Sequence, residues 1–97
     1  MSDQQRVAFI TGGGSGIGRA IAHRFAAAGC AIADWNLAGA EETVAQLGAA
    51  GHAGLALQAD VRSAEAVQAA VDATIARFGQ VDILVSNAGL SDGRDIL

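Results

Sequence analysis

Short apolar runs alternate with amphipathic runs along most of the chain. The continuous apolar runs predict four strands, at residues 7–10, 30–33, 52–59 and 81–86. Apolar residues at steps of three and four predict three helices, at residues 17–28, 37–47 and 64–78. Gly29 and Gly79 follow the first and third helices, where glycine commonly ends a helix. Strands that alternate with single helices predict an α/β fold, with a parallel sheet between helices in the strand order 3-2-1-4.

The same spacing predicts which side chains each helix turns toward the sheet. For the first helix these are Ile17, Ile21, Phe25 and Ala28. For the second they are Leu37, Ala40, Val44 and Leu47, and for the third Ala64, Val67, Val71, Ile75 and Phe78. Each set forms one apolar stripe, as a helix packed on a sheet requires.

The composition fits one small domain with a core of aliphatic side chains. The chain has 97 residues, of which 52% are hydrophobic and 4% aromatic, and its net charge is −4. The negative charge argues against nucleic acid and anionic membranes as partners. Cys30 is expected to be a buried hydrophobe, and the isolated His23 and His52 predict no metal site. The polar start of the chain is unlike a secretory signal, so a cytoplasmic location is expected.

The glycine run Thr11-Gly12-Gly13-Gly14-Ser15-Gly16-Ile17-Gly18 connects the first strand to the first helix. Glycines permit a tight turn and a close approach to a ligand, and the N–H groups of the following helical turn attract an anion. Arg19-Ala20 follow, in place of the Lys and Ser or Thr of a triphosphate-binding P-loop. The spacing Gly-x-Gly-x-x-Gly, counted from Gly12, also fails because residue 17 is Ile. The run predicts a phosphate-binding turn, with a plain strand-to-helix turn as the alternative.

Three further polar residues, Asp34, Asp60 and Asn87, lie at the carboxyl ends of expected strands. Parallel strands bring these ends to one edge of the sheet, beside the glycine run, where the strand order reverses. A ligand site is therefore predicted at this edge. Asp34 suits hydrogen bonds to the hydroxyls of an adenosine ribose, with a solvated turn residue as the alternative. Asp60 precedes the expected helix cap Ser63, so a simple turn is the alternative there.

This set of motifs resembles the short-chain dehydrogenase/reductase family, whose fingerprint is Thr-Gly-x-x-x-Gly-x-Gly. Asp60-Val61 and Asn87-Ala88-Gly89 resemble the family's Asp-Val pair and Asn-Ala-Gly motif, and the resemblance covers residues 6–89. It implies that residues 1–97 are the N-terminal part of a single NAD(P)-binding Rossmann domain. The implied activity is hydride transfer between a secondary alcohol or ketone and a nicotinamide cofactor. The implied cofactor-binding residues are Gly12, Ser15, Gly16, Ile17, Gly18, Asp34, Trp35, Asp60, Val61, Asn87, Ala88 and Gly89.

The resemblance also implies a role for individual residues. Asp34 would repel a 2′-phosphate, and Ser15 stands where a basic residue would indicate NADP, so NAD is favoured over NADP. Asp60 is implied to accept a hydrogen bond from the adenine amino group. Trp35 either walls the adenine pocket or packs at the rim of the sheet. The Asn of residues 87–89 is implied to steady the sheet, while the Ala-Gly backbone lies against the cofactor ribose.

Two departures from the family qualify these expectations. Asp34 lies 16 positions after Gly18, where about 20 is usual, so the second strand is expected to lack about two residues. The chain stops at Leu97 and contains no tyrosine, whereas family members continue with strands five to seven, a catalytic Ser and a Tyr-x-x-x-Lys pair. We therefore expect no catalytic residue and no turnover in this chain alone, and an open sheet edge at residues 83–85.

Two other classes of function stay open. A non-catalytic product would bind nucleotide weakly or pair with another subunit through the open edge. A methyltransferase-type sheet with a glycine-rich first loop would bind S-adenosylmethionine instead. For the longer parent protein, the family implies a small-molecule alcohol or ketone substrate and a homo-oligomer.

Overall fold

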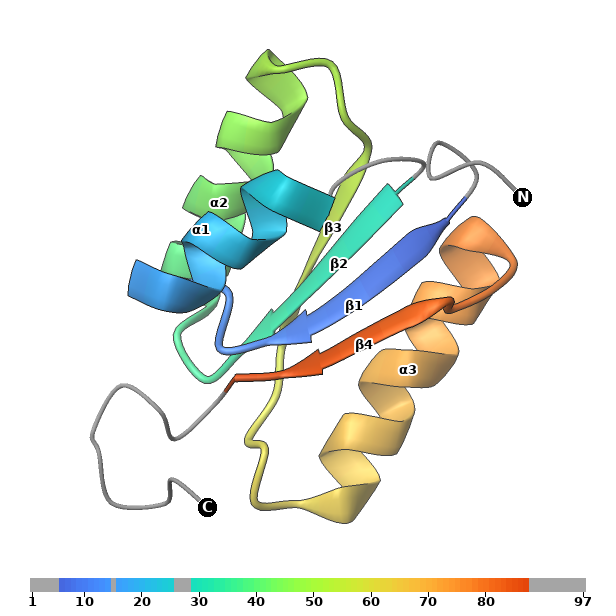
Figure 1. The fold of residues 1–97 in the computed structure, drawn as a ribbon. Coiled ribbons are helices and arrows are strands. Elements are labelled where there is room, and N and C mark those ends of the chain that lie inside the picture. The colour runs from blue at the N-terminus through green and yellow to red at the C-terminus, as the bar shows by residue number, and fades with distance from the viewer. Residues whose placement is uncertain (1–5, 15, 26–28, 88–97) are drawn as a thin grey trace.

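The computed structural model describes residues 6–14, 16–25 and 29–87 and shows a four-stranded parallel sheet with helices on both faces (Figure 1). The elements follow in the order β1 (Val7–Thr11), α1 (Gly16–Phe25), β2 (Gly29–Asp34), α2 (Leu37–Ala49), β3 (Gly54–Gln58), α3 (Ala64–Phe78) and β4 (Ile83–Ser86). The strand order is β3-β2-β1-β4, which confirms the predicted α/β fold and topology. No helix among these residues is long and apolar enough to cross a bilayer.

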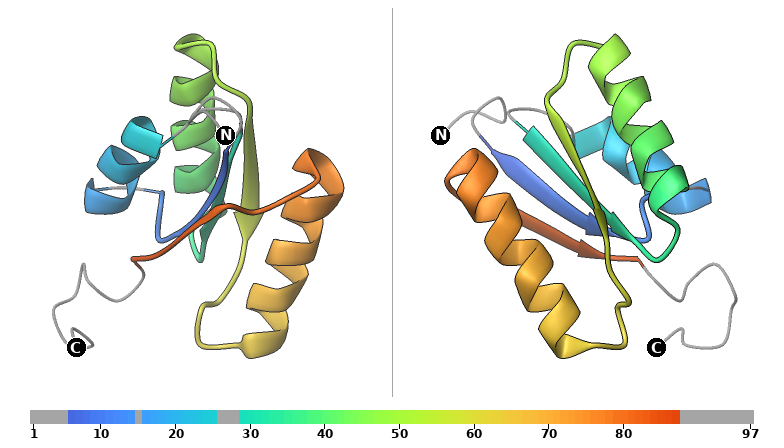
Figure 2. Two further views of the ribbon diagram at one scale, coloured as in Figure 1. Left: turned by 45° about the vertical axis from the view of Figure 1, so that its right-hand side comes forward. Right: turned by 180° about the vertical axis from the view of Figure 1, so that it is seen from behind.

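The helices form two layers around the sheet. Figure 2 shows α1 and α2 on one face and α3 on the other. Alternate residues of β1 enter the two cores: Ile10 packs with α1 and α2, whereas Phe9 packs on the side of α3. All five residues of β1 are buried, which explains why this strand reads as a continuous apolar run.

The predicted buried face of α1 is wrong at two positions. Ile17 and Phe25 are 61% and 43% exposed, while the buried residues of the helix are Gly18 and Ala22. Gly18 lies so close to the Gly12 carbonyl that a Cβ has no room there. Because small residues let the helix approach the sheet, the larger side chains are turned away from it. Ile21 is half-buried against the core as predicted, and Ala28 lies outside the described residues.

The second strand is not short, contrary to the sequence-based expectation. The described part of α1 ends at Phe25, residues 26–28 lie outside the described residues, and Gly29, predicted to stop that helix, is instead the first residue of β2. Gly29 pairs with Val7 and lies against the ring of Phe78, so it is buried. Since β2 has six residues, five of them in register with β1, the missing positions lie outside the strand. Asp34 consequently reaches the carboxyl edge of the sheet.

In the other two helices, small residues occupy the closest approach to the sheet. Thr43 is fully buried in α2 beside the predicted Ala40 and Leu47. In α3 the buried residues are Ala70 and Thr74, whose hydroxyl donates to the Ala70 carbonyl oxygen at 2.8 Å. The other residues of the two predicted stripes are mostly half-buried, namely Leu37, Val44, Val67, Val71 and Phe78. The prediction is wrong at Ala64 and Ile75, which are exposed.

The caps of the helices explain where they begin and end. The Ser63 side chain accepts from the Ala66 N–H and starts α3, as predicted. Gly79 ends α3 with φ 89°, a left-handed conformation that favours glycine. Asn36, whose role the sequence reading missed, starts α2 by accepting from the Gly39 N–H at 3.3 Å.

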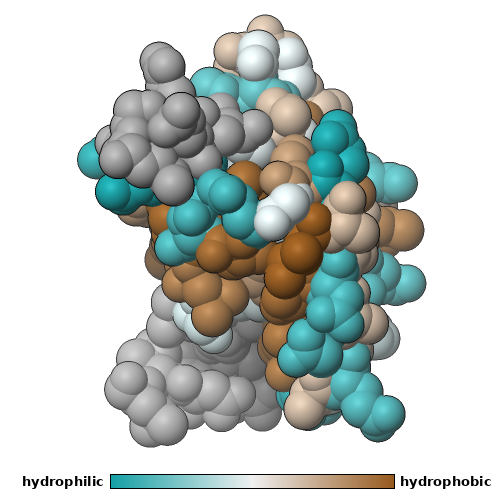
Figure 3. Space-filling model, turned by 90° about the vertical axis from the view of Figure 1, so that its right-hand side faces the viewer, coloured by the Kyte–Doolittle hydropathy of each residue, from teal (hydrophilic) through white to brown (hydrophobic). Residues whose placement is uncertain are grey.

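Within the described residues β4 is an edge strand, because it pairs with β1 and with no other strand. Leu84 in the middle of this strand is 66% exposed. Figure 3 shows apolar atoms gathered between polar ones on the side of the molecule that carries β4 and α3. The predicted open edge at residues 83–85 is therefore present in this part of the chain.

Candidate functional site

The carboxyl ends of the four strands gather the predicted polar residues at one edge of the sheet (Figure 1). Three hydrogen bonds join neighbouring strand ends there. The Gly12 N–H donates to the Ala33 carbonyl oxygen at 2.8 Å, and the Ala59 N–H donates to the Asp34 carbonyl oxygen at 3.1 Å. Asn87, after β4, donates from its side-chain amide to the Gly12 carbonyl oxygen at 3.1 Å. The glycine turn thus lies between the ends of β2 and β4.

The glycine turn needs glycine at specific positions for two different reasons. Gly12 and Gly16 have φ of 71° and 58°, in the left-handed region that L side chains rarely adopt. Gly18 lies against the Gly12 backbone and the Asn87 side chain, with no room for a Cβ. The exposed Gly16 and Ile17 begin α1, so the N-terminal turn of this helix faces solvent. An anion has access to its free N–H groups.

Asp34, at the end of β2, is tied to the glycine turn by backbone hydrogen bonds. Its Oδ2 accepts from the Gly14 N–H at 2.8 Å, and its Oδ1 accepts from the Asn36 N–H at 2.9 Å. The half-buried carboxylate is therefore held in one orientation, and its bond with the Asn36 N–H is also the one that an Asp in a turn makes. Each carboxylate oxygen keeps a second lone pair for a ligand hydroxyl.

Trp35 follows Asp34 and points mostly into solvent. Its residue surface is 71% exposed, so it does not pack into the rim of the sheet. Its carbonyl oxygen accepts from the Gln58 side-chain amide at 3.3 Å, which joins the end of β2 to the end of β3. An exposed indole beside a strand end leaves a flat apolar surface available to a planar ligand.

Asp60 forms a turn with Arg62 at the end of β3. Its Oδ1 accepts from the Arg62 backbone N–H at 3.0 Å, and its Oδ2 accepts from the Arg62 guanidinium at 3.0 Å. The side-chain hydrogen bond with Arg62, followed by the backbone one, lowers the pKa of the Asp60 carboxyl. The turn ahead of the Ser63 cap, the alternative left open by the sequence, is thus present. Val61 between them is exposed.

Asn87 is a buried tie between β4, β1 and the glycine turn. Its backbone N–H donates to the Thr11 hydroxyl at 3.1 Å, and the Thr11 hydroxyl donates to the Val85 carbonyl oxygen at 3.4 Å. The residue is only 5% exposed. Its side-chain Oδ1 has no hydrogen-bond partner among the described residues. Ser15, Ala88 and Gly89, which the sequence also predicted to bind the cofactor, lie outside the described part of the chain.

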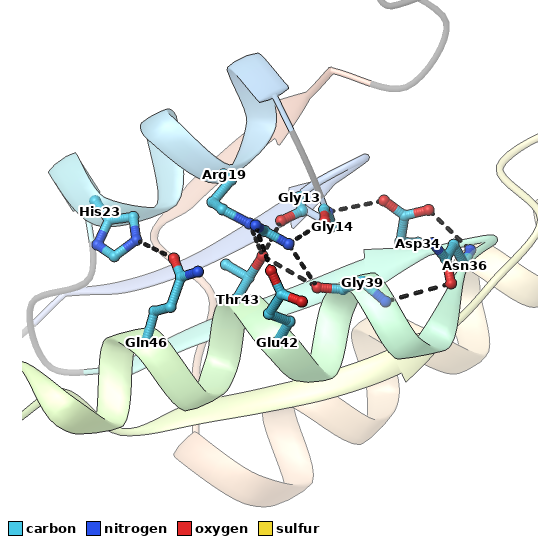
Figure 4. Close-up of polar contacts among 10 residues, drawn as sticks. All are labelled: Gly13, Gly14, Arg19, His23, Asp34, Asn36, Gly39, Glu42, Thr43 and Gln46. Atoms are coloured by element: carbon cyan, nitrogen blue, oxygen red, sulfur yellow. Dashed lines mark hydrogen bonds and ion pairs between the residues drawn. The ribbon is translucent and has the colours of Figure 1, made fainter.

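Arg19 and Thr43 are residues of this edge that the sequence reading missed. They join α1 and α2 to the carbonyl side of the glycine turn (Figure 4). A signal was present in the sequence, because Arg19 directly follows the glycine run and Thr43 interrupts the apolar stripe of α2. A polar residue on a buried helix face must have a partner, and here that partner is the turn.

The remaining reactive side chains show no second site in the described ranges. Cys30 is buried, as predicted, and burial raises the pKa of its thiol to about 12. His23 shares a hydrogen bond of 3.0 Å with the Gln46 side chain on the surface. The described residues contain no group of three or more side chains that could hold a metal ion.

The comparisons with known proteins agree with this geometry. The family model for short chain dehydrogenases matches residues 6–97. The chain is 49% identical over 88 residues to D-threitol dehydrogenase of Mycolicibacterium smegmatis, covering 89% of this chain and 34% of that protein. It is 41% identical over 92 residues to 2-dehydro-3-deoxy-D-gluconate 5-dehydrogenase of Escherichia coli, covering 95% of this chain and 36% of that protein.

Two solved structures share the fold. A hydroxysteroid dehydrogenase from Escherichia coli matches with a TM-score of 0.79 and 39% identity, over 92% of this chain and 40% of that one. A short chain dehydrogenase/reductase from Burkholderia phymatum, solved in complex with NAD, matches with a TM-score of 0.77 and 40% identity, over 81% and 29%. The chain thus spans about a third of the length of the curated relatives it matches. The family and sequence matches exclude the methyltransferase alternative, whose sheet would also carry a glycine-rich first loop, and they show that the chain belongs to the short chain dehydrogenase family.

Proposed function

We propose that residues 1–97 are the cofactor-binding part of a dehydrogenase that transfers hydride between a secondary alcohol or ketone and NAD. The observation that carries the proposal is the hydrogen bond from Gly14 to Asp34, which joins an anion-attracting turn to a carboxylate at the next strand end. A dinucleotide offers both complements, because its diphosphate is an anion and its adenosine ribose is a diol. Family membership supports the reaction class.

In this proposal the chain binds and orients the cofactor. The N–H groups of residues 16–18 face the diphosphate, with Ser15 beside them, and the glycines allow its close approach. Asp34 accepts from the ribose hydroxyls. Trp35 and Val61 border the adenine, while the Asp60 carboxylate shares its acceptor capacity between Arg62 and the adenine amino group. The backbone of residues 87–89 lies against the second ribose. When bound, the nicotinamide supplies the hydride acceptor or donor.

The charge of Asp34 favours NAD over NADP in this site. A 2′-phosphate would stand beside the carboxylate and repel it, whereas the free 2′-hydroxyl of NAD donates a hydrogen bond to it. The charges of Arg19 and Arg62 do not offset this charge, because Arg19 is paired with Glu42 and Arg62 with Asp60.

We further propose that this chain alone does not turn over substrate. It contains no tyrosine, and its six basic residues are all arginine, so it has no Tyr-x-x-x-Lys pair to transfer a proton. The substrate, the catalytic residues and any homo-oligomer belong to the longer protein. The cytoplasmic location stays a prediction.

A second candidate is a non-catalytic chain that pairs with another subunit. The exposed Leu84 on the edge strand β4 favours it, since an unpaired edge with an apolar side chain is a template for strand addition.

Titration calorimetry of the purified 97-residue chain with NAD⁺ and NADP⁺ tests the proposal. We expect saturable NAD⁺ binding, with NADP⁺ weaker by about tenfold or more, since 1.4 kcal/mol of repulsion changes Kd tenfold. The substitution Asp34→Asn should narrow this difference, while Asp72→Asn, which removes a carboxylate from the exposed face of α3, should leave it unchanged. Self-association without NAD⁺ binding would favour the second candidate, and NADH oxidation with ketones would contradict the predicted lack of turnover.

A further inference from the structure

Arg19 directs its guanidinium into the protein and not toward the predicted ligand. Its Nε donates to the Thr43 hydroxyl at 2.8 Å, and its Nη1 donates to Glu42 Oε1 at 2.8 Å. Its Nη2 donates to the carbonyl oxygens of Gly14 and Gly39, the latter at 3.3 Å (Figure 4). Every guanidinium nitrogen has a protein partner, and the side chain is only 23% exposed. The Arg19 guanidinium therefore binds α2 and the glycine turn.

The Arg19 contact limits where the Thr43 hydroxyl can send its proton. Because the hydroxyl accepts from Arg19 Nε, it donates elsewhere, to the Gly13 carbonyl oxygen at 2.7 Å or the Gly39 carbonyl oxygen at 3.2 Å, and the shorter distance favours Gly13. Thr43 is fully buried, so this orientation has no competition from solvent. Arg19 holds the next carbonyl of the turn, that of Gly14, directly.

The peptide group between Gly13 and Gly14 is held at both of its polar ends. Its carbonyl oxygen accepts from Thr43, and its N–H donates to Asp34 Oδ2 at 2.8 Å. Two glycines without a Cβ impose little orientation of their own, so the partners fix this peptide plane. A line of hydrogen bonds thus runs from Arg19 through Thr43 and the turn to the carboxylate of Asp34.

We infer that Arg19 is a positioning residue for the adenosine end of the dinucleotide site, acting through Thr43 and the Gly13–Gly14 peptide on Asp34. The inference rests on the proposed function, because it assumes that Asp34 receives the ribose hydroxyls. A carboxylate already fixed by its neighbours loses less conformational freedom when the ligand binds. The planar guanidinium reaches several acceptors at once, which the single ammonium of a lysine does not.

Paired ligands with and without the ribose hydroxyls distinguish this role from a general structural one. We expect Arg19→Met to weaken binding of ADP by about tenfold, the effect of one charge-assisted hydrogen bond. The Kd of 2′,3′-dideoxyadenosine diphosphate, which has no ribose hydroxyl for Asp34, should change by less than about twofold in the same variant. Nuclear magnetic resonance titration of the glycine amides follows both ligands into the millimolar range.

Two sets of variants control this experiment. Arg24→Met removes the same charge from an exposed position on the same helix and should leave both affinities unchanged. Thr43→Val keeps the volume but removes the hydroxyl, and should reproduce the selective loss of ADP binding. Thr43→Ser keeps the hydroxyl and should restore it. This pair decides the question even where Arg19→Met fails to fold.

Each other result overturns a defined part of the argument. Equal losses of ADP and dideoxy-ADP binding would reduce Arg19 and Thr43 to structural residues and overturn the inference. Unchanged ADP binding in Arg19→Met and Thr43→Val would do the same while leaving the proposed function intact. If the unchanged chain binds neither ADP nor NAD⁺, the proposed function fails, and the inference fails with it.

Discussion

Gly18 is the residue at which fold and site depend most directly on each other. Its Cα lies against the Gly12 backbone and the Asn87 amide, and this contact brings α1 down onto the end of β1. Any side chain there must displace backbone, because the nearest neighbour of an added Cβ is the carbonyl group of Gly12.

We predict that Gly18→Ala destabilises the chain by about 1–3 kcal/mol, as overpacking of a tight contact typically does. It should also weaken NAD⁺ binding, because α1 must move away from the turn. Urea unfolding measures the first effect and calorimetry the second. Gly16→Ala is the matched comparison, since a Cβ there meets open space and its cost comes only from φ 58°. A stability loss in Gly18→Ala no larger than in Gly16→Ala would contradict the steric argument.

Cys30 gives the chain a predictable response to alkali. Burial raises the pKa of its thiol from 9.0 to about 12 in the folded chain. Below pH 9 the thiol is mostly protonated in both the folded and the unfolded chain, so its ionisation does not reduce the free energy of unfolding. As the pH rises from 9 toward 12, the unfolded thiol ionises first, and stability falls. The expected loss in urea midpoint above pH 9 should be smaller in Cys30→Ala, and equal losses would refute this assignment.

At the scale of elements, the sequence predicted the type and order of all seven helices and strands in the described ranges. Continuous apolar strands and caps such as Ser63 and Gly79 are local signals, so they can be read without the structure. The buried helix faces were less predictable. The closest contacts use Gly18, Ala22, Ala70 and Thr74, and the sequence alone does not show that small side chains are chosen for proximity.

The start of β2 shows another limit of sequence reading. Gly29 looks like a helix stop, but its pairing with Val7 and its contact with Phe78 depend on residues far away in the chain. The same holds for the site. Motif spacing located the glycine turn and Asp34, whereas the links through Arg19 and Thr43 arise from the packing of α1 against α2.

Two glycines at helix ends should respond in opposite directions to alanine. Gly79→Ala should cost about 1 kcal/mol, because φ 89° is unfavourable for a residue with a Cβ. Gly48→Ala should stabilise by about 0.5–1 kcal/mol, since Gly48 lies within α2 and a Cβ there meets open space. Thermal unfolding of both variants measures the difference. A shift in the same direction would show that cap geometry is not the cause.

At the scale of the whole molecule, the described chain is a three-layered structure whose sheet has edge strands at β3 and β4. Helices α1 and α2 cover one face of the sheet and α3 covers the other, whereas the outer side of β4 has no strand beside it in this part of the chain. Half-buried Ile83 and Val85 and exposed Leu84 lie along that edge.

We predict that the 97-residue chain self-associates through β4 as its concentration rises, and that Leu84→Lys reduces this association. A lysine on an edge strand disfavours pairing with another chain. Sedimentation velocity over a range of concentrations measures the effect. Phe25→Lys introduces the same charge at another exposed apolar position, on α1. Similar reductions in both variants would point to nonspecific contacts and against the edge.

The bond from Asn87 to Gly12 joins residues separated by 75 positions in the chain. During synthesis the ribosome therefore releases the glycine turn long before the amide that completes it. A nascent chain that ends before β4 contains β1 and α1 but lacks this hydrogen bond from Asn87. We predict that the proposed nucleotide binding appears late in translation, when β4 has emerged and paired with β1.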